Sequence, residues 1–169
     1  MLGPDLGAVI CGSAAGTASA RAEAYYAHPQ NKFWPTLYET GAVPERLAPR
    51  DFRRVLEFGL GLTDLTKHRH GQDKAFARDA GDGARLEAKI AAAAPRILAF
   101  NGKAAALAAF GVARVEYGWR RERFGGARTI VLPSTSGAAS GAWDIAWWRI
   151  FAEALNEHRA EESRDGQDR

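Results

Sequence analysis

Short apolar runs alternate with segments of helical spacing along this chain. Each run is too short for a typical helix and is followed by glycine, proline or a polar residue, which predicts buried strands. The predicted strands are 6–11, 59–65, 96–102 and 127–133. Apolar positions recur at helical spacing in the predicted helices 33–40, 49–58, 84–94, 103–110 and 144–157. Asp144 begins the last of these, where its carboxylate is a suitable N-cap.

This alternation predicts an α/β fold. Strands that are apolar on both sides need helices on both faces, so we expect a single-domain three-layer α/β/α sandwich with a mostly parallel central sheet. In such sheets ligands bind at the carboxyl ends of the strands. The notable loops all follow predicted strands, at 11–16, 63–70, 100–103 and 132–140, whereas 118–126 is predicted as a turn or loop. The sequence therefore predicts one site built from residues far apart in the chain.

Length and composition fit one globular domain. The chain has 169 residues, of which 46% are hydrophobic and 25% charged. We expect the domain to span 1–158 and the polar segment 159–169 to be a disordered tail. No apolar run approaches the roughly 20 residues of a membrane span, and the first residues lack the pattern of a signal peptide. We therefore expect a monomeric cytoplasmic protein with no membrane partner.

Basic residues are more clustered than the net charge of +3 suggests. One run occupies 67–70, and a second holds Arg120, Arg121 and Arg123. Acidic residues gather partly near the C-terminus, so the body of the protein is more basic than the whole chain. A basic face favours a partner that bears phosphate, although a merely solvated surface has the same composition.

Several common catalytic motifs are missing from the sequence. It contains no GxxxxGK[ST], no GxGxxG and no GxSxG, so a nucleotide hydrolase, a dinucleotide enzyme and a hydrolase elbow are unsupported. The single cysteine, Cys11, excludes a disulfide framework and a multi-cysteine metal site. The four histidines lack the spacing of metal ligands. We expect no metal and no organic cofactor.

The stretch YYAHPQNKFW, at 25–34, places rings beside hydrogen-bonding groups. Its first part is predicted as a loop, because Pro29 restricts the residue before it and cannot donate a hydrogen bond. Packing into the core is one explanation for the rings, and the wall of a binding pocket is the other. Asn31 offers donors and an acceptor, which suits the edge of a planar heterocycle or a water molecule.

Two further segments carry candidate chemistry. Asp64 ends a predicted strand, where it is either a turn cap or a carboxylate that positions or activates water. The hydroxyl groups and backbone amides of 134–136 suit a phosphate group. A flat base, a phosphate backbone and a water molecule are the components of base excision.

Five blocks of the chain, taken in order, resemble the uracil-DNA glycosylase superfamily. They are VICGSAAG, YYAHPQNKFWPTLYETG, GLGLTDL, LAFNGKAA and VLPSTSGAAS, and they extend from residue 8 to about 140. CG with a glycine four residues later, HPxNxFW and LPxxSG are similar to the mismatch-specific uracil and thymine glycosylase branch. YYAHPxNxFW with LPSTS resembles the hypoxanthine-DNA glycosylase branch still more closely.

The chain departs from the mismatch-specific branch at three places. That branch has GxNPG in its first block, where the Asn positions the attacking water, whereas Ala14 stands at this position here. In the hypoxanthine branch the catalytic Asn lies in YYAHPxN, and Asn31 matches it. Ser134 replaces an Asn of the last block, and 138–141 offer no large side chain to wedge into a duplex.

The resemblance implies a site on these positions. Asn31 and Asp64 would place the water, and Tyr26 would stack on the extruded base. The implied base pocket consists of Gly12, Ser13, Ala14, Tyr26, His28 and Phe33. The implied DNA contacts are Ser134, Thr135, Ser136, Gly137, Lys67 and Arg69.

Two functions follow as hypotheses. The first is a monofunctional DNA glycosylase that removes a deaminated base, with uracil as the first expectation and hypoxanthine or xanthine as the alternative. The second is a non-catalytic binder of damaged or single-stranded DNA, which the replacement by Ala14 motivates. Either function implies DNA as the partner, and association with the nucleoid if the source is bacterial.

Overall fold

The computed structural model describes residues 1–14, 17–66 and 80–165. Within them lies a five-stranded sheet in the order β2-β1-β3-β5-β4. The strands are β1 (Ala8–Ala14), β2 (Leu60–Thr66), β3 (Ile97–Asn101), β4 (Gly118–Trp119) and β5 (Arg128–Leu132). Neighbouring strands are parallel except for β4, which is antiparallel to β5. The predicted α/β fold with a mostly parallel sheet is confirmed.

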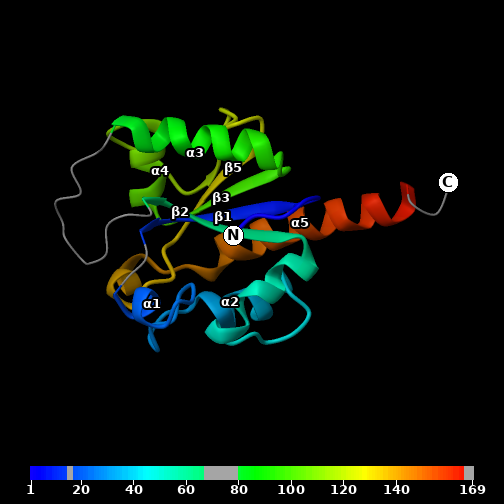
Figure 1. The fold of residues 1–169 in the computed structure, drawn as a ribbon, viewed down its shortest axis with the longest axis horizontal. Coiled ribbons are helices and arrows are strands. Elements are labelled where there is room, and N and C mark those ends of the chain that lie inside the picture. Colours follow the sequence, from blue (N-terminus) through cyan, green and yellow to red (C-terminus); the bar gives the residue numbers. More distant parts are fainter. Residues whose placement is uncertain (15–16, 67–79, 166–169) are drawn as a thin grey trace.

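Helices cover both faces of this sheet (Figure 1). They are α1 (Thr17–Arg21), α2 (Phe33–Glu39), the 3-10 helix η1 (Pro49–Phe58), α3 (Ala80–Ala93), α4 (Lys103–Phe110), the 3-10 helix η2 (Gly137–Ala142) and α5 (Ile145–Asp165). α3 and α4 pack on one face, and α2, η1 and α5 pack on the other. No helix among the described residues is long and apolar enough to cross a bilayer.

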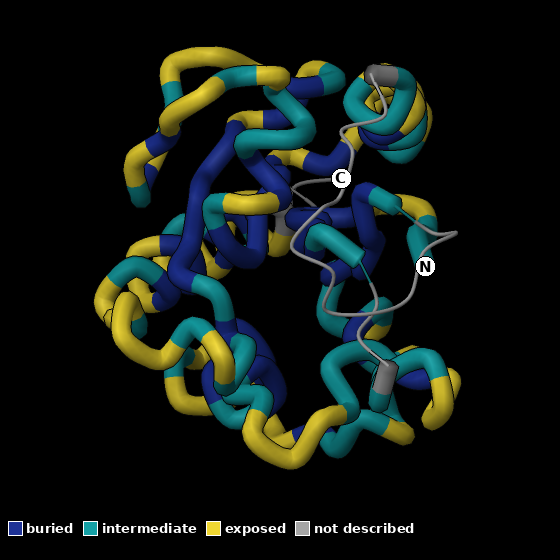
Figure 2. Tube along the Cα trace, turned by 90° about the vertical axis from the view of Figure 1, so that its left-hand side faces the viewer, coloured by how far each residue is buried: buried dark blue, intermediate teal, exposed yellow. Residues whose placement is uncertain are grey.

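Side chains of each parallel strand alternate between two separate cores. In β1, Ala8 and Ile10 face the core that contains Trp148 of α5, whereas Val9 and Cys11 face the core beneath α3 and α4. All four side chains are fully buried, and the strands form the dark interior of Figure 2. Burial on both faces explains why the strands read as unbroken apolar runs in the sequence.

Several elements differ from those predicted. β1 continues to Ala14, three residues into the predicted small-residue loop, because β2 supplies a pairing partner up to Thr66. β4 lies within the predicted loop 118–126; two residues are too few to produce a strand pattern, and only pairing with β5 defines it. α3 begins at Ala80, four residues before the predicted start. η1 has the predicted bounds but 3-10 geometry.

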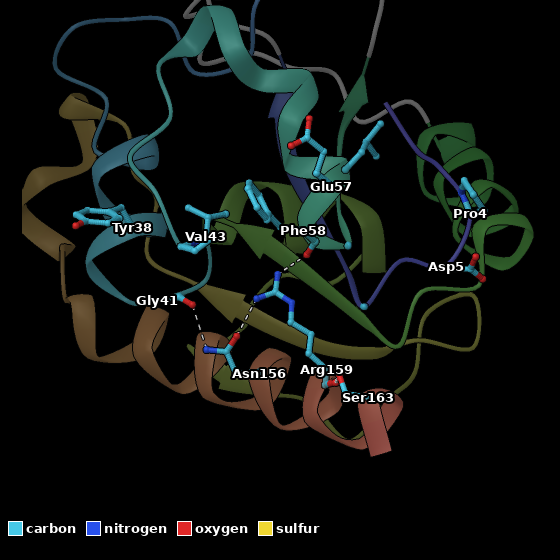
Figure 3. A pocket seen from close by; sticks show the side chains of 14 residues that line it. Pro4, Asp5, Tyr38, Gly41, Val43, Glu57, Phe58, Asn156, Arg159 and Ser163 are labelled. Atoms are coloured by element: carbon cyan, nitrogen blue, oxygen red, sulfur yellow. Dashed lines mark hydrogen bonds between the residues drawn. The ribbon is translucent and has the colours of Figure 1, made fainter. Parts of the chain in front are cut away.

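The predicted disordered tail is wrong for its first seven residues, because α5 continues to Asp165. The guanidinium of Arg159 donates to the backbone carbonyl oxygens of Ala42, at 3.0 Å, and Phe58, and to the side chain of Asn156, at 2.8 Å. Asn156 donates to the carbonyl oxygen of Gly41, at 3.1 Å. Figure 3 shows the bonds among Gly41, Asn156, Arg159 and Phe58. Together with the bond to Ala42, they tie the helix to the loop after α2 and to the end of η1.

Arg159 and three residues bonded to it or to Asn156 help to line a groove of about 1020 Å³; they are Gly41, Phe58 and Asn156. Gly7 and Gly59, which directly precede β1 and β2, also line it, so the groove lies at the amino ends of the strands. Residues predicted to form the active site are absent from its lining. The large groove and the candidate site are therefore at opposite ends of the sheet.

Arg159→Ala is expected to destabilise the fold, because two partly shielded carbonyl oxygens would lose a charged donor. Hydrogen bonds to charged groups contribute about 1.5–3 kcal/mol when well shielded, and we expect a loss of about 2 kcal/mol in urea denaturation. Arg164→Ala, which removes an exposed arginine from the same helix, is the control, with an expected change below about 0.5 kcal/mol. Equal losses in the two variants would contradict the stabilising role of Arg159.

Candidate active site

Three residues form a row across the carboxyl edge of the sheet. Asp64 of β2 pairs in register with Gly12 of β1, and the pairing of Cys11 with Phe100 brings Asn101 of β3 level with Gly12. Because side chains alternate along each strand, all three positions face the side covered by α2 and α5. Asp64 and Asn101 are only 9% and 8% exposed, so this row is polar and buried.

Gly12 leaves the middle of the row open for side chains from both sides. A Cβ atom at this position would lie 2.7 Å from Asp64 Oδ1 and 3.2 Å from the hydroxyl oxygen of Tyr26. Both distances are shorter than ordinary van der Waals contact. The glycine is therefore what allows the Asp64 carboxylate and the Tyr26 hydroxyl to lie over the same backbone.

Tyr26 is held over the row by its ring and its backbone. The ring stacks on Phe33 of α2, with centroids 3.8 Å apart and planes at 26°. Its φ of 53° is in the left-handed region, which is uncommon for a bulky residue and is often found at functional sites. The hydroxyl oxygen is buried, and the Asn101 side chain lies close enough to affect its ionisation.

Burial raises the pKa of the Tyr26 phenol well above its usual 10, and the nearby Asp64 carboxylate raises it further. Burial raises the pKa of Tyr25 as well, to about 12, again with a contribution from Asp64. The Tyr26 phenol therefore stays protonated at neutral pH. It can act there as a hydrogen-bond donor.

Asn101 is a buried polar residue of this edge that the sequence analysis did not name as a candidate. Its Nδ2 donates to Thr135 Oγ1 at 2.9 Å, and its Oδ1 accepts from the Thr135 backbone N–H at 3.0 Å. The two bonds fix the orientation of the amide and join the end of β3 to the loop after β5. Its place in LAFNGKAA, as a polar residue at the end of a buried strand, was the available signal.

The Asn31 side chain is directed by the start of α2. Its Oδ1 accepts from the Phe33 backbone N–H at 3.0 Å, and none of the described residues accepts a bond from its Nδ2. The next residue, Lys32, donates its backbone N–H to Thr135 O at 2.9 Å. The loop that carries Asn31 is therefore attached to the loop after β5, with an amide donor still available.

The loop after β5 also lies at this edge. Ser134 Oγ accepts from the Ser136 backbone N–H at 3.3 Å, and Thr135 is fully buried. A Cβ atom on Gly137 would lie 2.9 Å from Gln30 Cβ, which shows how closely this loop approaches 28–32. The predicted gathering of strand-end loops is thus present for 11–14, 64–66, 100–103 and 134–137.

For other predicted residues the structure gives no contact with the row of Gly12, Asp64 and Asn101. His28 is exposed, and its Nδ1 accepts a bond from the Gln30 backbone N–H within its own turn, at 3.2 Å. Lys67 and Arg69 lie outside the described residues. Cys11 faces the other core, where burial raises the pKa of its thiol, so it remains protonated. No group of three His, Cys, Asp or Glu side chains suited to a metal ion occurs in the described part of the chain.

Comparison with known proteins identifies the family. A sequence model of the "Uracil DNA glycosylase superfamily" matches residues 2–153. The chain belongs to the uracil DNA glycosylase superfamily. It is therefore a DNA glycosylase, which is a hydrolase of DNA repair, and its partner is DNA.

A solved structure supports the fold of this DNA glycosylase. The chain is similar to the solution NMR structure of a "putative Uracil DNA glycosylase" from Methanosarcina acetivorans. The two share 21% sequence identity, the match covers 92% of this chain and 94% of the other, and the TM-score is 0.58. At this identity the likeness concerns the three-layer architecture and not the substrate.

Gly12→Ala is expected to impair base excision by this glycosylase far more than it impairs folding. The added methyl group would displace the Asp64 carboxylate or the Tyr26 hydroxyl by a few tenths of an ångström or more. We expect a fall of about 10-fold or more in single-turnover rate, since small misplacements of reacting groups are costly. Gly141→Ala is the control, because its Cβ atom would meet nothing within 4 Å. A parental rate for Gly12→Ala would show that this crowded position is not part of the active site.

Proposed function

We propose that this protein is a monofunctional DNA glycosylase that hydrolyses the N-glycosidic bond of a deaminated base, with uracil as its first substrate. The observation that carries this proposal is the position of the Asp64 carboxylate and the Tyr26 ring over Gly12. A buried carboxylate beside an aromatic face suits both tasks of base excision, which are to hold a flat base and to supply water to its sugar.

Stacking on the Tyr26 ring holds the extruded base outside the DNA duplex. An enzyme that acts on a base must extrude it, which costs a few kcal/mol of lost stacking and pairing. Phe33 already covers one face of the Tyr26 ring, so the base stacks on the opposite face. Such stacking contributes about 1–3 kcal/mol per base, which offsets much of the cost of extrusion.

Asp64 and Asn31 place the attacking water. The Asp64 carboxylate accepts a hydrogen bond from the water and stabilises the positive charge that develops on the sugar as the base leaves. Asn31 has an unused amide donor for the water or for the base edge. Both groups come from segments that the structure fixes, so little reorganisation is needed during the reaction.

The departing base leaves as an anion, which hydrogen-bond donors from the protein must stabilise. β1 is paired with β2 as far as Ala14 but with β3 only as far as Cys11. Backbone groups of alternate β1 residues face β2 and β3 in turn, and Ala14 is paired with Thr66 of β2. Ser13, next to Gly12, faces the β3 side beyond the last paired residue, so its backbone can contact a ligand. Backbone amides fixed in this way stabilise developing negative charge in the transition state.

Hypoxanthine or xanthine is the alternative substrate. Ala14 cannot position water as the Asn of the mismatch-specific branch does, whereas Asn31 stands where the hypoxanthine branch has its catalytic Asn.

A non-catalytic binder of damaged DNA is the competing function. Strand cleavage by alkali after incubation with uracil, hypoxanthine or xanthine, each in single and double strands, distinguishes these cases. Binding without any abasic product would establish the binder.

Asp64→Asn is expected to reduce the single-turnover rate about 10²-fold or more, the scale of a lost acid–base group, with little change in DNA affinity. Asn31→Asp tests the second residue. It keeps the acceptor for the Phe33 N–H and removes only the Nδ2 donor. If both residues act on one water, the double variant will cost less than the sum of the two single losses. An unchanged rate in Asp64→Asn would reduce Asp64 to a turn cap.

Tyr26→Phe is expected to keep most of the excision rate, whereas Tyr26→Ala should lose it, because stacking needs the ring and not the hydroxyl. Single-turnover rate assays on the two variants test this point. Equal rate losses in Phe and Ala variants would show that the hydroxyl contacts the base or the water.

A further inference from the structure

Rings and cations alternate along the β4 edge of the sheet. Lys103 Nζ lies 4.5 Å from the centre of the Tyr117 ring, and the Arg128 guanidinium lies 4.3 Å from the centre of the Trp119 ring. Between them Gly118 is covered by Trp147, whose Cζ3 would lie 2.8 Å from a Cβ atom there. We name this surface the β4-edge track, and its residues are Lys103, Tyr117, Trp119, Arg121, Arg123 and Arg128.

The β4-edge track begins at the active-site edge and runs away from it. Lys103 follows Asn101 by two residues, at the carboxyl end of β3. Gly118 pairs with Val131 near the carboxyl end of β5, and the antiparallel direction of β4 carries the chain toward the amino end, where Arg128 lies. At about 3.3 Å per residue, the four steps from Leu132 to Arg128 span roughly 13 Å. The track therefore leads from the base pocket down the side of the sheet.

Most of the cations of the track have no carboxylate partner. Lys103 pairs with Glu116 at 3.1 Å, and the neighbouring Arg120 pairs with Glu122 at 3.0 Å. No ion pair in the described part of the chain involves Arg121, Arg123 or Arg128. All three are exposed, and the Trp119 side chain is 36% exposed. Arg123 donates to the Gly126 carbonyl oxygen at 2.9 Å. A hydrogen bond from its own backbone lowers the pKa of the Glu122 carboxyl, and the nearby Arg120 and Arg121 lower it further. The surface thus offers an excess of positive charge beside a partly exposed indole ring.

We propose that the β4-edge track binds the single-stranded DNA that flanks the excised base. Guanidinium groups bind phosphates, and an exposed indole ring stacks on an unpaired base, which is the combination used by proteins that bind single strands. A duplex fits poorly, because its bases are already stacked and its persistence length of about 50 nm prevents it from following a short surface that turns away from the site. The small side chains of η2 also provide no wedge to hold a duplex open.

The proposal rests on the proposed function only for the direction in which the strand leaves the site. Affinity for an undamaged strand needs no excision, so the two can fail separately. A protein that excises no base but binds single strands through the track would retain this inference and lose the proposed function. A protein that excises uracil at the parental rate and binds single strands equally well without the track would do the reverse.

The test measures binding of a fluorescently labelled undamaged oligo-dT strand by anisotropy, over a series of salt concentrations. The triple variant Arg121→Ala/Arg123→Ala/Arg128→Ala should bind at least 10-fold more weakly. The slope of log K against log salt should become less steep by about 2, since each phosphate contact to a single strand contributes about 0.7. Trp119→Ala should weaken binding about 5-fold or more through lost stacking.

Matched controls separate this surface from general charge and surface effects. Arg46→Ala/Arg50→Ala/Arg53→Ala removes the same charge from exposed arginines near η1, and Tyr38→Ala removes an exposed ring from α2. Both should bind single strands within about 2-fold of the parent protein. Equal losses in the controls, unchanged binding in the track variants, or a loss confined to duplex DNA or to an acidic peptide would overturn the proposal. Unchanged circular dichroism and melting show that each variant is folded.

Discussion

The register of β1 against β2 determines the chemistry at the carboxyl edge. It places Asp64 directly beside Gly12, on the face where Tyr26 arrives from the loop before α2. A shift of one residue would turn Asp64 toward the opposite core and put Thr63, now beneath α3, in its place. Because both strands are buried on two faces, the packing of every apolar side chain in them resists such a shift. The position of the carboxylate is thus enforced by the hydrophobic core.

The same edge is braced by polar contacts that extend from strand to strand. Asn101 and Thr135 join β3 to the loop after β5 by two reciprocal bonds, and Lys32 joins that loop to the start of α2. Buried polar networks of this kind are costly when a member is lost, so they hold one arrangement. Tyr26, with its left-handed backbone and its stacked ring, is fixed within this frame. Contacts within the protein therefore hold this edge of the sheet in one arrangement.

The sequence predicted most of the fold because the parallel strands are buried on both faces and the helices are separated by Gly and Pro. It did not predict β4, since a two-residue strand exists only through its pairing with β5. The helical continuation of α5 was missed for a similar reason: EHRAEESRD has a polar composition, and the contacts of Arg159 with Ala42 and Phe58 are long-range.

For the site, strand-end position predicted the neighbourhood of Gly12, Asp64 and 134–137 correctly. Asn101 was quoted within a motif but not recognised as a candidate, because only its pairing with Thr135 shows that the amide is buried and oriented. For His28 the motif suggested a pocket residue, and this stays a prediction; its exposed side chain accepts a bond within its own turn. The mutual geometry of Tyr26 and Asp64 depends on crowding over Gly12, which no linear pattern records.

The two ends of the sheet have different physical roles. This division determines which residues can be substituted without disturbing the contacts that hold α5. Arg159 and Asn156 secure α5 at the amino ends of the strands (Figure 3), while the loops of the proposed site lie at the carboxyl ends. Loop replacement or randomisation at the carboxyl edge leaves the contacts of Arg159 and Asn156 untouched. Such a scaffold is a suitable starting point for laboratory evolution toward other damaged bases, with α5 left unaltered.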